Sequence, residues 1–171
     1  MAKYETPRFQ VVKKDGAFQI RHYQGFSTTA VREDQFSGNR GFGVLFGYIS
    51  GQNQDKEKIA MTVPVINELE KGRMSMEFIV PSKYQEHIPG PLNPNIEIKH
   101  YPPHHAAVLI FSGGVNPDKI QLQVDKLSDR LMDMNIQPKG PFRLARYNSP
   151  FSIPKFRHNE IIVEVDWPET T

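Results

Sequence analysis

The stretch FSGNRGFGVLFGYISG, Phe36–Gly51, combines the apolar spacing of an amphipathic helix with five glycines. A glycine inside a helix costs about 1 kcal/mol relative to alanine, so this composition needs a reason. On a helical wheel, four apolar side chains share one face: Phe42, Leu45, Phe46 and Ile49. Gly43 and Gly47 lie one turn apart beside that face. We predict a helix that follows a candidate N-cap at Asp34, ends at Gly51 and has one flat flank.

Short strands are predicted on both sides of this helix. Those of the first half are Phe9–Lys14, Phe18–Tyr23, Phe26–Arg32, Ile59–Leu69 and Met74–Val80. A proline-rich loop at 81–94 follows, and the second half has strands at Ile96–Tyr101, Ala106–Ser112, Phe142–Tyr147 and Glu160–Val165. Its helix begins at Asn116-Pro117-Asp118. This order predicts an α+β fold with a curved sheet or partial barrel, built from a duplicated βαββ unit without an evident residue-level repeat.

Composition limits the possible classes of protein. The 171 residues are 38% hydrophobic and 23% charged, which is enough for a folded core in one domain or two fused halves. The net charge of +2, with scattered basic residues, argues against binding to nucleic acid. The chain has no cysteine, which excludes disulfides, Cys zinc sites and Cys nucleophiles. With no signal core or membrane span, we expect a soluble, cytoplasmic protein.

The histidines and the helix face each leave two interpretations open. The run HYPPHH, His100–His105, is predicted at a hairpin tip and lacks the spacing of a zinc pair. His22 shares a strand face with Phe18 and Ile20. It is either a core or rim residue or a ligand. The helix face either packs on the sheet or carries a flat apolar ligand, and Arg40 projects from its glycine flank.

Sequence motifs typical of enzymes are missing. There is no nucleophile elbow, phosphate loop, zinc-protease helix or dinucleotide fingerprint. Glu57 and Glu160 are capable of acid–base work, but no nucleophile or metal motif accompanies them. We therefore predict no catalytic residues and no enzymatic activity.

Five segments, in order over nearly the whole chain, resemble the SOUL haem-binding protein family. They are FQIRHYQGF (Phe18–Phe26), LFGYISGQNQDKEKIAMTVPV (Leu45–Val65), MEFIVPSKY (Met76–Tyr84), FSGG (Phe111–Gly114) and ARYNSPFSIPKFRHNEIIVEV (Ala145–Val165). The resemblance implies a single domain over residues 1–171 that folds as a distorted antiparallel β-barrel with two helices. It also implies a ligand, haem or another tetrapyrrole, lying in a shallow apolar groove.

Carried over by position, the resemblance names the residues of that groove. One wall is the helix face Phe42, Leu45, Phe46 and Ile49, and the facing loop runs from Phe151 to Phe156. Arg40 and Lys155 are candidate partners for the propionates. His22 occupies the place of the histidine that one branch of the family uses to ligate iron, whereas another branch lacks it. The wall departs from relatives by its phenylalanines and by having more glycine. The phenylalanines would stack on a porphyrin or fill the groove.

The sequence thus predicts non-covalent haem or tetrapyrrole binding, for buffering or transfer. The alternative is a small-molecule or protein-binding module of the bacterial effector-binding or gyrase-inhibitor-like fold, without physiological haem binding.

Overall fold

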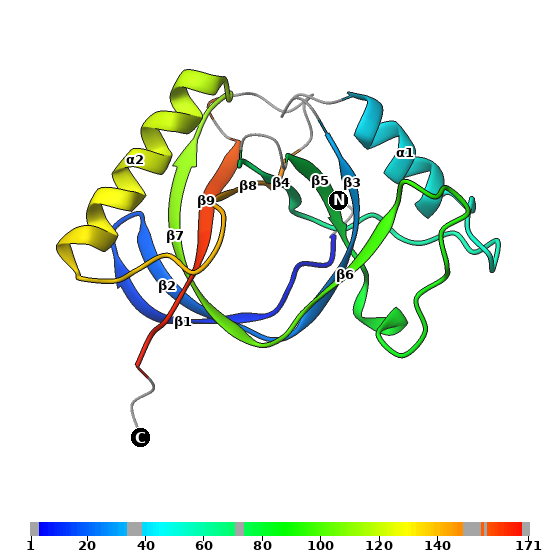
Figure 1. The fold of residues 1–171 in the computed structure, drawn as a ribbon, viewed down its shortest axis with the longest axis horizontal. Helices are drawn as coiled ribbons and strands as arrows, with labels where there is room; N and C mark the ends of the chain where they lie inside the picture. Colours follow the sequence, from blue (N-terminus) through cyan, green and yellow to red (C-terminus); the bar gives the residue numbers. More distant parts are fainter. Residues whose placement is uncertain (1–3, 34–38, 71–73, 149–154, 156, 169–171) are drawn as a thin grey trace. The chain divides into compact units, whose positions relative to one another are not determined.

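The computed structural model describes residues 4–33, 39–70, 74–148, 155 and 157–168 (Figure 1). Within these ranges the elements are β1 (Phe9–Asp15), β2 (Phe18–Tyr23), β3 (Phe26–Arg32), α1 (Asn39–Ile49), β4 (Val65–Glu68), β5 (Ser75–Ile79), the 3-10 helix η1 (Ser82–Tyr84), β6 (Glu97–Tyr101), β7 (His104–Ser112), α2 (Pro117–Asp133), β8 (Arg143–Arg146) and β9 (His158–Val165). This order and the antiparallel pairing confirm the predicted α+β class with two helices.

The chain divides into two compact units, and each draws on separate stretches of sequence. Unit 1 consists of Met1–Pro7 and Gly25–Pro102. Unit 2 consists of Arg8–Gln24 and Pro103–Thr171. The interpretation of the whole chain as one domain stays a prediction.

Unit 1 is a sheet in the order β4-β5-β3-β6, with α1 packed against β3 and β5 (Figure 1). A buried apolar cluster joins the helix to the sheet and to the loops around it: Val31, Leu45, Tyr48, Ile49, Ile59, Met76, Phe78, Val80, Tyr84 and Ile96. Successive strand residues point to opposite faces, so Ala30 and Glu77, which lie opposite each other, face away from α1.

Unit 2 is a sheet in the order β1-β2-β7-β9-β8, with α2 against β7 and β9. Asn116 caps α2 by accepting a hydrogen bond from the backbone of Lys119, and proline opens the helix as predicted. The guanidinium of Arg130 lies 4.7 Å from the centre of the Phe18 ring, so α2 covers the Phe18 side of β2. Within the described part of the chain, neither helix is long and apolar enough to cross a membrane.

The two units repeat one arrangement but exchange a strand. Unit 1 contains the order β3-α1-β4-β5 and unit 2 the order β7-α2-β8-β9, which confirms the duplicated βαββ unit. β2 precedes β3 in the chain but belongs to unit 2, and β6 precedes β7 but belongs to unit 1. β2 runs beside β7, and β6 runs beside β3.

A residue-level repeat accompanies this exchange, so the expectation that there is none was wrong. The motif IRHY begins at Ile20 on β2, and IKHY begins at Ile98 on β6. In both units the motif's cation, Arg21 or Lys99, lies on the sheet face away from the helix. The repeat is not evident in the sequence, because it is four residues long and only the strand register shows that its two copies are equivalent.

Some predicted boundaries also change. The strand expected over Ile59–Leu69 is reduced to Val65–Glu68, after a cis peptide bond at Val63-Pro64. The run HYPPHH is not a hairpin tip, because β6 and β7 pair with β3 and β2 instead of with each other. The Pro102-Pro103 pair between them lacks the backbone N–H groups that a ladder needs. The expected N-cap at Asp34 lies outside the described residues.

Candidate functional site

Helix α1 is fixed to the sheet of unit 1 at its first turn. The carboxylate of Glu33, just after β3, accepts a hydrogen bond of 2.7 Å from the backbone N–H of Gly41. A Cβ at position 41 would collide with that carboxylate and come within 3.1 Å of the Val31 side chain. One glycine of the opening stretch is therefore required for close packing of helix and strand, as the packing interpretation predicted.

The predicted apolar wall divides into a buried part and an exposed part. Leu45 and Ile49 are buried in the core of unit 1, and Leu45 has no exposed surface. Phe42 is 40% exposed and Phe46 is 50% exposed. Their rings stack with centroids 5.9 Å apart, and Phe42 also meets the ring of Phe78 edge-on at 5.3 Å. The core thus holds the exposed aromatic pair in place, and ligand contact by Leu45 and Ile49 stays a prediction.

The exposed side of α1 continues from this pair across the glycines to Arg40. We call this side the α1 arc; it consists of Arg40, Phe42, Gly43, Phe46 and Gly47. Helical geometry orders it as aromatic pair, glycines and then arginine around the axis. A Cβ on Gly43 would meet no atom within 4 Å. Within the described residues, the exposed Arg40 side chain forms no hydrogen bond or ion pair.

The end of α1 is organised by the residues that gave the family resemblance. Gly51 has a φ of 119°, which favours glycine, and turns the chain out of the helix. The amide of Asn53 then donates to the carbonyl oxygens of Tyr48 and Glu57, at 2.9 and 2.8 Å. The Tyr48 hydroxyl donates to the Pro89 carbonyl, and burial raises its pKa to about 12. This part of the motif is structural.

His22 lies in unit 2, on β2, and is half-buried. It is opposite His105 of β7, and the centres of the two imidazole rings are 4.6 Å apart. Its side chain is on the same face of the strand as Ile20, which is the α2 side. Iron ligation by His22 stays a prediction. Among the described residues, no three potential metal ligands come together.

Two further predicted site residues belong to the segment before β9. Lys155 is exposed and belongs to unit 2, whereas Phe151 lies outside the described residues. The loop from Phe151 to Phe156 is therefore described only at position 155.

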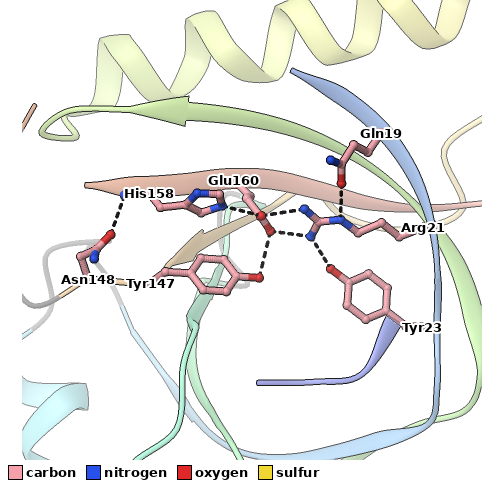
Figure 2. Close-up of polar contacts among 7 residues, drawn as sticks. All are labelled: Gln19, Arg21, Tyr23, Tyr147, Asn148, His158 and Glu160. Carbon is pink, nitrogen blue, oxygen red and sulfur yellow. Dashed lines mark hydrogen bonds and ion pairs between the residues drawn. The ribbon is translucent and has the colours of Figure 1, made fainter. Parts of the chain in front are cut away.

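Sequence reasoning missed a buried polar centre in unit 2, on the sheet face away from α2 (Figure 2). We call it the Glu160 centre; its members are Gln19, Arg21, Tyr23, Tyr147, His158 and Glu160. Arg21 donates two hydrogen bonds of 2.8 Å to Glu160, one to each carboxylate oxygen. Tyr147 donates to the same carboxylate at 3.0 Å, and His158 contacts it at 2.7 Å. Gln19 and Tyr23 accept from Arg21 at 2.8 and 2.9 Å.

The pKa shifts of the Glu160 centre fit a structural role. Burial alone would raise the pKa of Glu160, but hydrogen bonds from His158 and Arg21 outweigh it and lower the pKa. Burial raises the pKa of Tyr23 to about 12 and that of Tyr147 further. Glu160 therefore stays ionised while Tyr23 and Tyr147 stay protonated, which does not suit the acid–base role considered for Glu160.

Unit 1 carries a counterpart around Glu77 on β5. The Glu77 carboxylate accepts from Thr28 at 2.6 Å and from Tyr101 at 2.7 Å, and the Lys99 ammonium lies 3.8 Å away. The glutamates occupy similar local sequences, MEFIV and NEIIV, and each cation comes from the exchanged strand. A charged residue inside each apolar strand was the signal available in the sequence.

Comparison with known proteins agrees with this duplicated fold. A family model described as SOUL heme-binding protein matches residues 4–164. The chain is 30% identical to Heme-binding protein 2 of Homo sapiens over 173 residues, which covers 92% of this chain and 84% of the relative. It is 28% identical to Heme-binding protein 2 of Mus musculus, with 94% and 83% covered.

Among solved structures, the EcmrR C-terminal domain has a similar fold. Its TM-score is 0.60 at 12% identity, with 92% of this chain and 98% of that chain covered, which is a likeness of fold alone. The family match, by contrast, extends from residue 4, before β1, to residue 164 within β9. The chain therefore belongs to the SOUL heme-binding protein family.

Proposed function

We propose that this protein binds haem or another tetrapyrrole without a covalent bond, on the α1 arc of unit 1. The observation that carries the proposal is the stacked, half-exposed pair Phe42 and Phe46 beside the open surface at Gly43. A flat apolar ring can lie against backbone at Gly43 while its edge meets the phenylalanines. Family membership and relatives named Heme-binding protein 2 support this choice of ligand.

Apolar burial supplies most of the binding free energy in this proposal. Covering a half-exposed phenylalanine contributes about 1 kcal/mol on the protein side, and the ligand adds its own buried face. A chain without cysteine has no thiol to attach to a haem vinyl group, which favours a non-covalent complex. An exposed site exchanges its ligand readily, so the role we propose is buffering or transfer without catalysis.

Histidines of unit 2 are separate candidates for the iron. His22 and His105 are neighbours across β2 and β7, and imidazole is a common haem ligand. Within unit 2 alone, and apart from the α1 arc of unit 1, we propose His22 as a ligand for haem iron and Lys155 as a cation for a propionate. Loss of a low-spin haem spectrum in His22→Ala, with the spectrum intact in His105→Ala, is the expected result. An unchanged spectrum in His22→Ala removes iron ligation from the proposal and leaves the α1 arc.

The test is a haemin titration followed by visible absorption, with Phe46→Glu as the main variant. Wild type is expected to show saturable 1:1 binding that Phe46→Glu weakens at least tenfold, because the charge removes the apolar contact. Leu122→Glu is the matched control, since Leu122 is a 52% exposed apolar residue on α2. Linear, unsaturable uptake by wild type would reject haem and favour the general binding module. Equal weakening by both variants would reject the α1 arc.

A further inference from the structure

β1 is an edge strand whose outer side is open. Among the described strands it pairs with β2 alone, and all seven of its residues are exposed. Gln24, after β2, donates its backbone N–H to the carbonyl of Arg8. Alternate residues of an antiparallel strand face the same neighbour, so Gln10 also faces β2 while the backbone groups of Phe9 and Val11 point outward. These outward N–H and C=O groups are hydrogen-bonding positions for one further strand.

Apolar side chains line this open edge. Phe9, Val11 and Val12 are 36%, 46% and 44% exposed. The Phe9 ring is held by β2, because the guanidinium of Arg21 lies 4.2 Å from its centre and the Tyr23 ring centre lies 5.2 Å from it. Phe9 and Val11 lie opposite Tyr23 and Arg21, and therefore share the sheet face away from α2. A strand added to β1 would meet a fixed aromatic ring and a valine on that face.

The charges of β1 indicate what kind of segment fits this edge. Lys13 and Lys14 follow the apolar residues, and neither forms a hydrogen bond or an ion pair within the described part of the chain. The carboxylate of Asp15 is already bound by Arg130. Lysines on an edge disfavour pairing with a second copy of the same strand, because both strands then carry the same positive charge. The same lysines favour a strand that brings carboxylates.

We propose that the outer edge of β1 binds an extended acidic segment of another protein, which adds to the sheet as a further antiparallel strand. The segment carries adjacent carboxylates for Lys13 and Lys14, and apolar β-branched side chains at the alternate positions opposite Phe9 and Val11. Main-chain hydrogen bonds to the outward groups of β1 supply affinity, and the side-chain contacts supply specificity. This surface belongs to unit 2, and the inference does not depend on the proposed binding of a tetrapyrrole by unit 1.

The experiment uses fluorescein-labelled peptides and fluorescence anisotropy, with the full chain at low ionic strength. The probe is Glu-Glu-Thr-Val-Thr-Val, whose valines lie opposite Val11 and Phe9 when it runs antiparallel to β1. Its matched control is Lys-Lys-Thr-Val-Thr-Val. Wild type is expected to bind the acidic probe about tenfold tighter than the basic one, the ratio that two exposed ion pairs supply when both are replaced by like-charge contacts.

Protein variants test where the acidic probe binds. Lys14→Glu is expected to abolish the preference for the acidic probe, because the charges at positions 13 and 14 then oppose each other. Lys126→Glu makes the same change at an exposed lysine of α2 and should keep the preference of wild type. Equal effects of the two variants would reject β1 as the binding surface.

A modified probe tests strand addition without altering the protein. The acidic probe with N-methyl groups on both valines keeps its charges but has no N–H at the positions that face Phe9 and Val11. It is expected to bind at least about tenfold more weakly than its parent, because it cannot donate those main-chain hydrogen bonds. Equal binding of the methylated probe and its parent rejects strand addition.

The remaining outcomes also decide the proposal. Equal affinity of wild type for the acidic and basic probes rejects an acidic partner. If no probe binds and wild type sediments as a dimer, a second copy of the chain occupies the edge and the proposal is wrong. If no probe binds to a monomer, the proposal is wrong as well, while the haemin titration tests the proposed function separately.

Discussion

Arg21 on β2 binds both carboxylate oxygens of Glu160 on β9, and both side chains are buried. The pair joins residues 139 positions apart in the sequence. Lys99 and Glu77 repeat it in unit 1 with a longer separation of 3.8 Å. Each cation arrives on the exchanged strand, so each pair connects that strand to the βαββ unit that receives it.

Removal of Arg21 from its pair with Glu160 should lower the stability of unit 2. Arg21→Met leaves a buried carboxylate without its main donor and is expected to lower the free energy of unfolding by about 3–5 kcal/mol. Lys99→Met is the matched variant and should cost much less, since the Lys99 side chain is 27% exposed and more distant from Glu77. Urea denaturation measures both. Equal losses would show that pair geometry does not set the cost.

The stability of unit 2 should depend on Glu160 ionisation at acid pH. The pKa of Glu160 is lowered in the folded state from its ordinary value of 4.5. Its contribution is therefore complete above about pH 4.5 and is lost as the pH falls through the lowered pKa, because protonation breaks the contact with Arg21. Denaturation from pH 7 to pH 2 should show an acid decline that Glu160→Gln largely removes. Asp15→Asn, which removes an exposed carboxylate beside Arg130, should retain most of it.

Alanine substitutions should separate the two roles of the α1 glycines. Gly43→Ala meets no atom within 4 Å, so it should stabilise the protein by up to about 1 kcal/mol through helix propensity. Gly41→Ala places a Cβ against Glu33 and Val31 and should destabilise it by about 1–3 kcal/mol. Thermal unfolding followed by circular dichroism compares them directly. A stabilising Gly41→Ala would contradict the packing described at the start of α1.

The amide of Asn53 should be a stability determinant of unit 1. Asn53→Ala removes the side-chain donor to the carbonyls of Tyr48 and Glu57 and is expected to cost about 2 kcal/mol. Asn93 provides the control, because among the described residues its side chain accepts one local, exposed hydrogen bond, from Asn95. The free energy of unfolding of Asn93→Ala should change by less than about 0.5 kcal/mol. A similar cost for both variants would mean that burial of Asn53 is unimportant.

Local pattern was enough to predict most of the elements. The run Asn116-Pro117-Asp118 predicted the start of α2 correctly, and Asn116 is its cap in the structure. The strand expected over Ile59–Leu69 was too long, because the regular pairing with β5 covers Val65–Glu68.

Long-range pairing was not available from the sequence. Alternation places Arg21 and Tyr23 on one face of β2, but nothing local shows that this face is buried against Glu160. The helix face was predicted as one apolar wall, whereas packing against Phe78 and its neighbours buries Leu45 and leaves Phe46 exposed. A Cβ on Gly43 would meet no atom within 4 Å, whereas one on Gly47 would meet the side chain of Gln52, whose position is set by the turn after α1.

The strand exchange has a consequence for synthesis on the ribosome. Of the described strands, β1 and β2 are synthesised before the others, yet β2 pairs with β7, which begins only at His104. An isolated two-stranded ribbon is marginal in water, so the nascent amino-terminal segment stays without a sheet while Gly25–Pro102 of unit 1 is completed. β9 follows the other described strands in the chain and carries Glu160, which accepts hydrogen bonds from Arg21 on β2. A nascent chain that stalls before His104 would thus carry residues 25–102 of unit 1 together with an aggregation-prone β1–β2 hairpin that lacks its partner strand β7.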